Sequence, residues 1–272
     1  MGTAGVRLTV AGLQTVGTPG DVAANLAELD EAAGDALTRG ADLLITPEMF
    51  LTGYDIGEQL HQLSPQDLVS EVAAVARRRG IALLVGLPEQ VGEAVYNTVV
   101  LIDADGTVVA QHRKSHLYGD LDRAYYTEGD DAVTVVDFRG VRLGLMICYD
   151  VEFPENVRAA ALLGAHALLV PTAQMVPFTF VADVVIRTRA WENQMFVAYI
   201  NHVGTERETT YVGRSSIVGP DAEVIDRLED GTGLVLGVVD TDVVEAAHRD
   251  NPYLVDRRPD LYAGIARVVS PE

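Results

Sequence analysis

The chain has 272 residues, 48% of them hydrophobic and 22% charged, which is ordinary for a globular protein with a substantial buried core. Its formal net charge of −20 argues against nucleic acid and against an anionic membrane as partners. No apolar run approaches the roughly 20 residues that span a bilayer, and the first residues lack the layout of a signal peptide. With a single cysteine, Cys148, no disulfide can form within the chain, which favours a reducing, cytoplasmic location.

Apolar runs typical of strands alternate with helical patterns through the first and middle parts of the chain. Strands are expected at 6–13, 41–47, 81–89, 96–103, 107–114, 140–147, 166–174, 195–201, 211–219, 222–228 and 234–240. Helices are expected at 22–40, 64–79, 154–164 and 180–194, with a short one from 240. Asp21 is the predicted N-cap of the first helix, Ser64-Pro65 the predicted start of the second, and the tail from Arg249 is expected to be rich in loops.

This order of elements predicts a single layered α/β domain over residues 1–272. Hairpins are expected at 96–111 and 212–239, the first of them around the turn-forming pair Asp105-Gly106. No linker or low-complexity segment divides the chain. We therefore expect mixed sheets covered by helices.

The stretch GVRLGLMICYDVEFPE, residues 140–155, places the lone cysteine at a corner between a strand and a helix. The apolar run ends in Cys148, and Pro154 stands where the first turn of a helix accepts proline. Nucleophiles are often held at such corners, because backbone N–H groups converge there. The alternative is an inert buried residue, since free cysteine commonly behaves as a small hydrophobe.

Two other strands also end in a reactive side chain. Glu48 follows the run at 41–47, and Lys114 closes the run at 107–114. Taken singly, each is more commonly a solvated charge. Together with Cys148 they supply what amide hydrolysis needs, because a carboxylate can take the thiol proton and an ammonium can stabilise the oxyanion formed when sulfur attacks a carbonyl or nitrile carbon.

Longer motifs surround these three residues, namely PEMFLTGY (47–54), HRKSHLYGDLDRAYYTEGD (112–130) and LMICYDVEFPE (145–155). They closely resemble the catalytic motifs of the nitrilase superfamily, the carbon–nitrogen hydrolases, and further blocks match over nearly the whole chain. The resemblance implies an αββα sandwich that pairs with a second copy into a homodimer or higher homo-oligomer. It also implies Glu48 as general base, Lys114 as oxyanion stabiliser, Cys148 as nucleophile and the peptide N–H of Tyr149 as second oxyanion donor, with no metal or cofactor.

Two positions depart from the family pattern. Many members carry a second glutamate seven residues before the glycine that ends the lysine motif, and counting back from Gly129 gives Asp122, which is one methylene shorter. Several branches that act on carboxylate-bearing substrates have an arginine where this chain has Glu152. If Glu152 faces the pocket, it repels acidic substrates and suits neutral or amine-bearing ones; otherwise it is a surface residue near a helix N-terminus. Tyr54, Gln174 and Met175 are expected to form pocket walls.

The residues of these motifs most resemble those of the branch that contains 5-aminopentanamidase and R-stereoselective amidases. The resemblance predicts a small primary amide as substrate, an acyl-enzyme on Cys148, and a carboxylic acid and ammonia as products; 5-aminopentanamide-like ω-amino amides are candidate substrates. An N-carbamoyl-amine amidohydrolase and a nitrilase are the alternative enzymes. A non-catalytic scaffold or binding protein is the alternative of a different class. His112 and His116 flank Lys114, but without further ligands nearby no metal site is expected.

Overall fold

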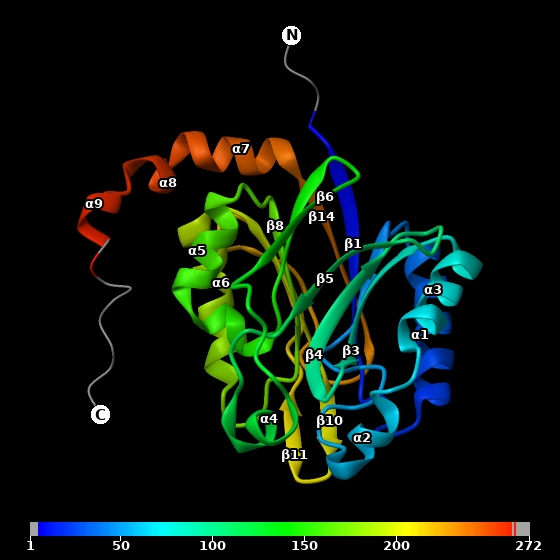
Figure 1. The fold of residues 1–272 in the computed structure, drawn as a ribbon. Helices are drawn as coiled ribbons and strands as arrows, with labels where there is room; N and C mark the ends of the chain where they lie inside the picture. The colour runs from blue at the N-terminus through cyan, green and yellow to red at the C-terminus, as the bar shows by residue number, and fades with distance from the viewer. Residues whose placement is uncertain (1–4, 263, 265–272) are drawn as a thin grey trace.

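The computed structural model describes residues 5–262 and 264, and in it two six-stranded sheets pack face to face (Figure 1). The first sheet has the order β14-β1-β2-β3-β4-β5. Its strands are β1 (Arg7–Gln14), β2 (Leu43–Ile45), β3 (Ala82–Val91), β4 (Ala94–Ile102), β5 (Val108–Arg113) and β14 (Gly233–Asp240). The second sheet has the order β13-β12-β9-β8-β7-β6. Its strands are β6 (Thr134–Phe138), β7 (Val141–Leu145), β8 (Ala167–Thr172), β9 (Phe196–Asn201), β12 (Ser216–Val218) and β13 (Val224–Arg227).

Helices cover the outer face of each sheet and complete an αββα sandwich (Figure 1). The first sheet is covered by α1 (Val22–Thr38) and α3 (Leu68–Arg79). The second is covered by α5 (Pro154–Leu162) and α6 (Ile186–Asn193), the latter preceded by a π-helical turn over Val181–Val185. The predicted fold class is thus confirmed.

Successive residues of the central strands enter different cores. In β2, Leu43 and Ile45 lie between the two sheets, whereas Leu44 packs in the core on the side of α1 and α3. In β8, Leu169 lies between the sheets and Leu168 in the core on the side of α5 and α6. Because both faces of these strands are buried, they appear in the sequence as continuous apolar runs rather than as alternating patterns.

The strands that lead to the reactive side chains all end at one edge of the sandwich. β1, β2 and β3 run parallel to one another, as do β7, β8 and β9. β5 runs parallel to β3, because both are antiparallel to β4. At the same end of the molecule lie α2 (Leu60–Leu63), α4 (Gly119–Tyr125) and the hairpin of β10 (Val203–Glu206) and β11 (Thr209–Val212), as Figure 1 shows.

Helix ends follow from capping chemistry. The Asp21 side chain accepts from the Ala24 N–H at the start of α1, as predicted. The start predicted for the second helix at Ser64-Pro65 is wrong, because Asp67 caps α3 by accepting from the Ser70 N–H, and the helix begins at Leu68. Gly80 ends this helix at a φ of 71°, in the left-handed region.

Other boundaries also differ from expectation. The central strand does not reach Cys148: β7 ends at Leu145, and Cys148–Glu152 form a 3₁₀ turn before α5. The hairpin at 96–111 is confirmed, whereas β14 leaves the second predicted hairpin to pair with β1 of the other sheet. Neither β6 nor α4 was expected. The short helix expected from 240 is confirmed as α7 (Thr241–Asp250), and the described part of the tail beyond it also holds α8 (Tyr253–Asp256) and α9 (Pro259–Tyr262).

Among residues 5–262 and 264, none of the helices has the combination of length and apolar character that crossing a bilayer requires.

Candidate active site

Glu48, Lys114 and Cys148 come together although they are far apart in the sequence. Glu48 lies just beyond β2, Lys114 directly follows β5, and Cys148 lies just beyond β7. All three side chains are buried. The charges of Glu48 and Lys114 both act on the Cys148 thiol, so the three groups form one electrostatic unit.

The Glu48 carboxylate is held firmly through one oxygen only. Its Oε1 accepts from Lys114 Nζ at 2.7 Å and from Asn97 Nδ2 at 2.7 Å. The other oxygen, Oε2, is buried and has no hydrogen-bond partner among the described residues. An unpaired buried carboxylate oxygen is costly, and such atoms in native proteins usually have a task. This oxygen is free to take a proton.

The backbone around Glu48 is fixed from two sides. His202 Nε2 lies 2.7 Å from the Glu48 carbonyl oxygen, which can only accept, so this ring nitrogen is the donor. On the other side the loop packs directly on β3, where a Cβ added at Gly86 would lie 2.5 Å from the Met49 nitrogen. Only glycine allows this close approach.

Lys114 lies between two carboxylates. Its Nζ donates to Glu48 Oε1 and to Asp122 Oδ2, at 2.7 Å each. Burial disfavours the charged amine, but the carboxylates of Glu48 and Asp122 outweigh it and raise the pKa of Lys114 well above its ordinary value. The residue is therefore a permanent ammonium, 5.7 Å from the centre of the Tyr54 ring.

Asp122 reaches Lys114 in spite of its shorter side chain. Its Oδ1 accepts from the Tyr54 hydroxyl at 2.7 Å, and its Oδ2 also accepts from the Tyr118 N–H at 2.8 Å. Because α4 begins at Gly119, this last bond ties the carboxylate to the start of its own helix. The arrangement holds Lys114 rather than leaving Asp122 free for other partners.

The Cys148 thiol is neutral at rest. Burial and the nearby charge of Glu48 raise the pKa of Cys148 well above its ordinary value, and the Lys114 ammonium only partly opposes them. The residue has a φ of 46°, a left-handed conformation that costs a non-glycine residue about 1–2 kcal/mol. Strain of this kind concentrates at functional sites.

The Glu48 carboxylate is suited to accept the thiol proton. Burial raises the pKa of Glu48 above its ordinary value, the charge of Lys114 opposes this, and the charge of Asp122 reinforces it. A carboxylate with a raised pKa is a stronger base, closer to the pH at which an enzyme works. A neutral thiol beside a strengthened base can react without a preformed thiolate.

Asp150 ties the segment that carries Cys148 to the segment that carries Lys114. Its carboxylate accepts from the main-chain N–H groups of Ile147 (3.2 Å), Ser115 (3.4 Å) and His116 (2.9 Å). It also accepts from the Ser115 hydroxyl at 2.9 Å and lies 3.4 Å from His112 Nε2. Burial disfavours its charge, but the hydrogen bonds of His112 and His116 hold the pKa of Asp150 below its ordinary value.

A small cavity of about 200 Å³ opens onto Cys148. Besides Cys148, five sequence-predicted residues lie in its wall, namely Tyr54, Tyr149, Glu152, Gln174 and Met175. The remaining lining residues are Tyr118, Ala173 and Phe178. A cavity of this size is below the range of about 300–1,000 Å³ typical of sites for drug-sized ligands, so it suits a small molecule.

Glu152 lines this cavity and precedes Pro154, the first residue of α5, by two positions. The side chain is half-buried, and burial raises the pKa of Glu152 while the charges of Arg189 and Lys114 lower it. Gln174 is fixed differently: its N–H donates to Asn201 Oδ1 at 2.9 Å, and its Oε1 accepts from the Tyr199 hydroxyl at 3.2 Å.

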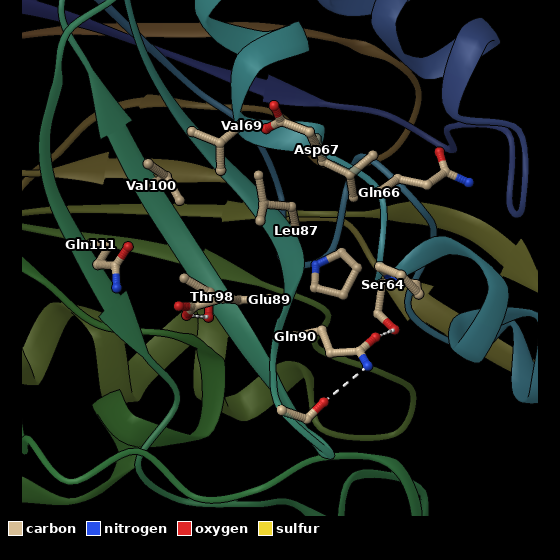
Figure 2. A pocket seen from close by; sticks show the side chains of 14 residues that line it. Ser64, Gln66, Asp67, Val69, Leu87, Glu89, Gln90, Thr98, Val100 and Gln111 are labelled. Carbon is tan, nitrogen blue, oxygen red and sulfur yellow. Dashed lines mark hydrogen bonds between the residues drawn. The ribbon is translucent and has the colours of Figure 1, made fainter.

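A second, larger cavity of about 430 Å³ lies between the start of α3 and the strands β3 to β5, and Figure 2 shows it. None of the predicted site residues lines it. Four of its polar side chains pair with one another: Ser64 Oγ donates to Gln90 at 3.1 Å, and Thr98 Oγ1 donates to Glu89 at 3.1 Å. Arg113 pairs with Glu89 as well, at 2.7 Å.

Several residues of the site could not be singled out from the sequence. Asn97 and His202 contact Glu48 from β4 and from the segment after β9. Glu206 accepts from the Tyr54 and Asp55 N–H groups and so holds the loop after Glu48. In the sequence, the available signal is a polar residue in or next to an apolar run typical of a buried strand. Such a pattern is too common to identify a site. Over the described part of the chain, no group of three or more His, Cys, Asp or Glu side chains is placed to bind a metal ion.

Comparison with known proteins relates this geometry to a family. The carbon–nitrogen hydrolase family model matches residues 7–249. The protein named hydrolase in pqqF 5'region, from Pseudomonas protegens, is 44% identical and covers 98% of this chain and 95% of its own. An (R)-stereoselective amidase of Pseudomonas sp. is 38% identical over 90% of each chain.

Solved structures of related proteins agree with this family assignment. An amidase from Nesterenkonia sp. superposes with a TM-score of 0.86 at 38% sequence identity, covering 95% of this chain and 96% of its own. A variant of that amidase in which a cysteine is replaced by alanine has been solved in complex with butyramide.

Proposed function

Because this chain belongs to the carbon–nitrogen hydrolase family, in which the Pseudomonas sp. and Nesterenkonia relatives are amidases, we propose that it hydrolyses small primary amides through a thioester on Cys148. The observation that carries the proposal is the unpaired, buried Oε2 of Glu48 next to a neutral thiol and a permanently charged Lys114. The butyramide complex of the Nesterenkonia amidase and the 200 Å³ cavity support a small substrate.

In the first half-reaction, Glu48 removes the thiol proton as sulfur attacks the amide carbon. The C=O π bond opens, and the resulting oxyanion is stabilised by the Lys114 ammonium and by the Tyr149 peptide N–H. Glu48 then returns its proton to the amide nitrogen, the C–N bond breaks, and ammonia leaves. Cys148 is left as a thioester.

In the second half-reaction, water replaces ammonia. Glu48 takes a proton from the water while the water oxygen attacks the thioester carbon. Lys114 and the Tyr149 peptide N–H stabilise the second oxyanion. The C–S bond breaks, the sulfur regains the proton from Glu48, and the carboxylic acid leaves. One amide and one water thus give one acid and one ammonia.

Asp122 and Tyr54 act through Lys114 in this scheme. Asp122 Oδ2 accepts a hydrogen bond from the same ammonium that donates to Glu48, and the Tyr54 hydroxyl donates to Asp122. Without Asp122, Lys114 would face Glu48 alone and would pair more closely with the base. We therefore assign Asp122 the positioning of the ammonium.

The direct test is the release of ammonia from a panel of short primary amides, with the matching nitriles and N-carbamoyl amines alongside. We expect ammonia from the amides, without carbon dioxide, and no turnover of the nitriles. Turnover of nitriles but not of amides, or carbon dioxide from the carbamoyl compounds as the dominant product, would contradict the proposal. Cys148→Ala is the matched blank.

We further propose that the protein is a cytoplasmic homodimer or higher homo-oligomer. The outer surface of the second sheet's helices exposes apolar side chains, with Leu162 49%, Leu163 54% and Trp191 44% accessible. Exposed apolar surface of this kind supports self-association. A lone, catalytic thiol suits a reducing compartment. Sedimentation that finds an active monomer would contradict the oligomer.

A further inference from the structure

We infer that Glu152 makes the cavity selective for amides whose acyl chain carries a cation, an inference that rests on the proposed amidase function. The substrate carbonyl must touch the Cys148 sulfur, so the rest of the cavity wall surrounds the remainder of the substrate. Glu152 is the only carboxylate among the described residues that line this wall. A carboxylate at that place can bind an ammonium group and repels another carboxylate.

The Glu152 carboxylate has no protein partner that would neutralise it. Within residues 5–262 and 264 it takes part in no salt bridge and accepts no hydrogen bond. Arg189 is the nearest candidate, but its guanidinium donates to the main-chain carbonyls of Val151 and Glu152 and to the Glu192 carboxylate at 2.9 Å. The arginine therefore fixes the backbone of the turn and leaves the Glu152 side chain available.

The neighbours of Glu152 in the cavity are aromatic. Tyr118 meets Tyr149 edge-on with the ring centres 5.1 Å apart, and it meets Phe178 edge-on at 6.2 Å. Tyr118 and Glu152 line the same cavity, and burial together with the charge of Glu152 raises the pKa of Tyr118. A carboxylate among aromatic rings is a favourable site for an alkylammonium, because the rings attract the cation and accept its methylene chain.

The same cavity disfavours an acidic substrate. A second carboxylate near Glu152 would lie in a half-buried place where water screens repulsion poorly. Lys114 cannot compensate, since Glu48 and Asp122 already occupy it. A neutral alkyl chain would pack on the aromatic wall but would leave the carboxylate unpaired. The expected order of preference is thus cationic, then neutral, then anionic amides.

The test compares three amides of matched length, namely 5-aminopentanamide, pentanamide and the monoamide of glutaric acid. We expect kcat/KM of the wild type to favour the amino amide over pentanamide by about 10-fold to 100-fold, the range given by a charge-assisted hydrogen bond. In Glu152→Gln this preference should fall at least 10-fold, because the amide side chain carries no charge to pair with the ammonium. Glu155→Gln is the matched control, because Glu155 is exposed and does not line the cavity.

Two further measurements keep the inference separate from the proposed chemistry. Binding of the same three compounds to Cys148→Ala, by calorimetry, should follow the same order without any turnover. The preference of the wild type for the cation should also weaken as salt is added. Equal use of the acidic amide, or an unchanged order in Glu152→Gln, would overturn the role of Glu152. Absence of ammonia from all three amides would overturn the amidase proposal, while the binding order would still decide for or against Glu152.

Discussion

The two cavities differ most in how their polar groups are paired. In the larger one, of about 430 Å³, Glu89 is bonded to Arg113 and to Thr98, and Gln90 to Ser64. In the smaller one, of about 200 Å³, the Glu152 side chain has no partner among the described residues. Glu48 does not line this cavity, but its charge acts on the Cys148 thiol that does, and its Oε2 is likewise unpaired. The smaller cavity is therefore the one at which unpaired polar groups remain available to a ligand.

This difference shows why size alone does not locate a site. Groups that are hydrogen-bonded to each other have little left to offer a ligand, whereas an unpaired carboxylate oxygen can still accept a proton or bind a cation. Substitutions near the smaller cavity should therefore have larger effects on catalysis than a substitution in the larger cavity.

The largest effect is expected from Glu48→Gln, which keeps the shape of the side chain and removes the base. We predict a loss of kcat of about 10²–10⁴-fold, the usual contribution of a general base. In the wild type the acid limb of kcat/KM should lie above the ordinary glutamate pKa of about 4.3, because burial raises the pKa of Glu48. As the pH falls through this pKa, the base is protonated and the rate drops. A near-normal rate in the variant would mean that another group is the base.

Lys114→Ala should follow, with a loss of about 10²–10³-fold in kcat, typical of one oxyanion donor. Lys114→Arg should not restore the rate, because the larger guanidinium cannot occupy the space between Glu48 and Asp122 with the same geometry. Steady-state kinetics with a short amide measures both variants. Full activity of the arginine variant would show that only charge matters at this position.

Asp150→Asn should act on stability first. Asparagine has one acceptor oxygen fewer, so main-chain N–H groups such as those of Ile147 and His116 lose an acceptor. We expect a loss of about 1–3 kcal/mol in the free energy of unfolding at pH 7. Since the pKa of Asp150 is held below its unfolded value of about 3.9, its contribution is present above that pH and is lost as the pH falls toward the folded pKa. The gap between wild type and variant in denaturant unfolding should therefore narrow below about pH 4. A gap that is constant with pH would argue against the ionic role.

The smallest effect is expected in the larger cavity. Glu89→Gln breaks a partly exposed pair with Arg113, and such pairs are worth about 0–1 kcal/mol. Neither kcat nor KM for a small amide should change beyond about 2-fold. A clear change in KM would mean that this cavity, not the one at Cys148, takes part in binding.

Much of this account was predictable from the residues. Continuous apolar runs predicted the buried strands, and the motifs around Glu48, Lys114 and Cys148 predicted the family, which the family model and the related amidases confirm. Short elements were missed, such as β6, because five residues with one charge carry too weak a pattern. The 3₁₀ turn at Cys148 was also missed, since its left-handed φ depends on the packing around it rather than on residue preference.

The parts of the site that escaped prediction depend on tertiary contacts. Asn97 contacts a carboxylate 49 positions away, and His202 contacts the same residue 154 positions away, so no local pattern marks either. The direction of Glu152 was open for a related reason: one residue at the end of a short turn can face either the cavity or the solvent. Only the path of the chain between β7 and α5 decides it.

The central claim is that Cys148 carries the acyl group. The most direct measurement is intact-protein mass spectrometry of the wild type quenched in acid during turnover of a slow short amide, with Cys148→Ala treated in the same way. The account predicts a mass increase equal to the acyl group minus one hydrogen, mapped by peptide digestion to Cys148 and absent from the variant. Ammonia release by Cys148→Ala at the wild-type rate, or an adduct on another residue, would contradict it.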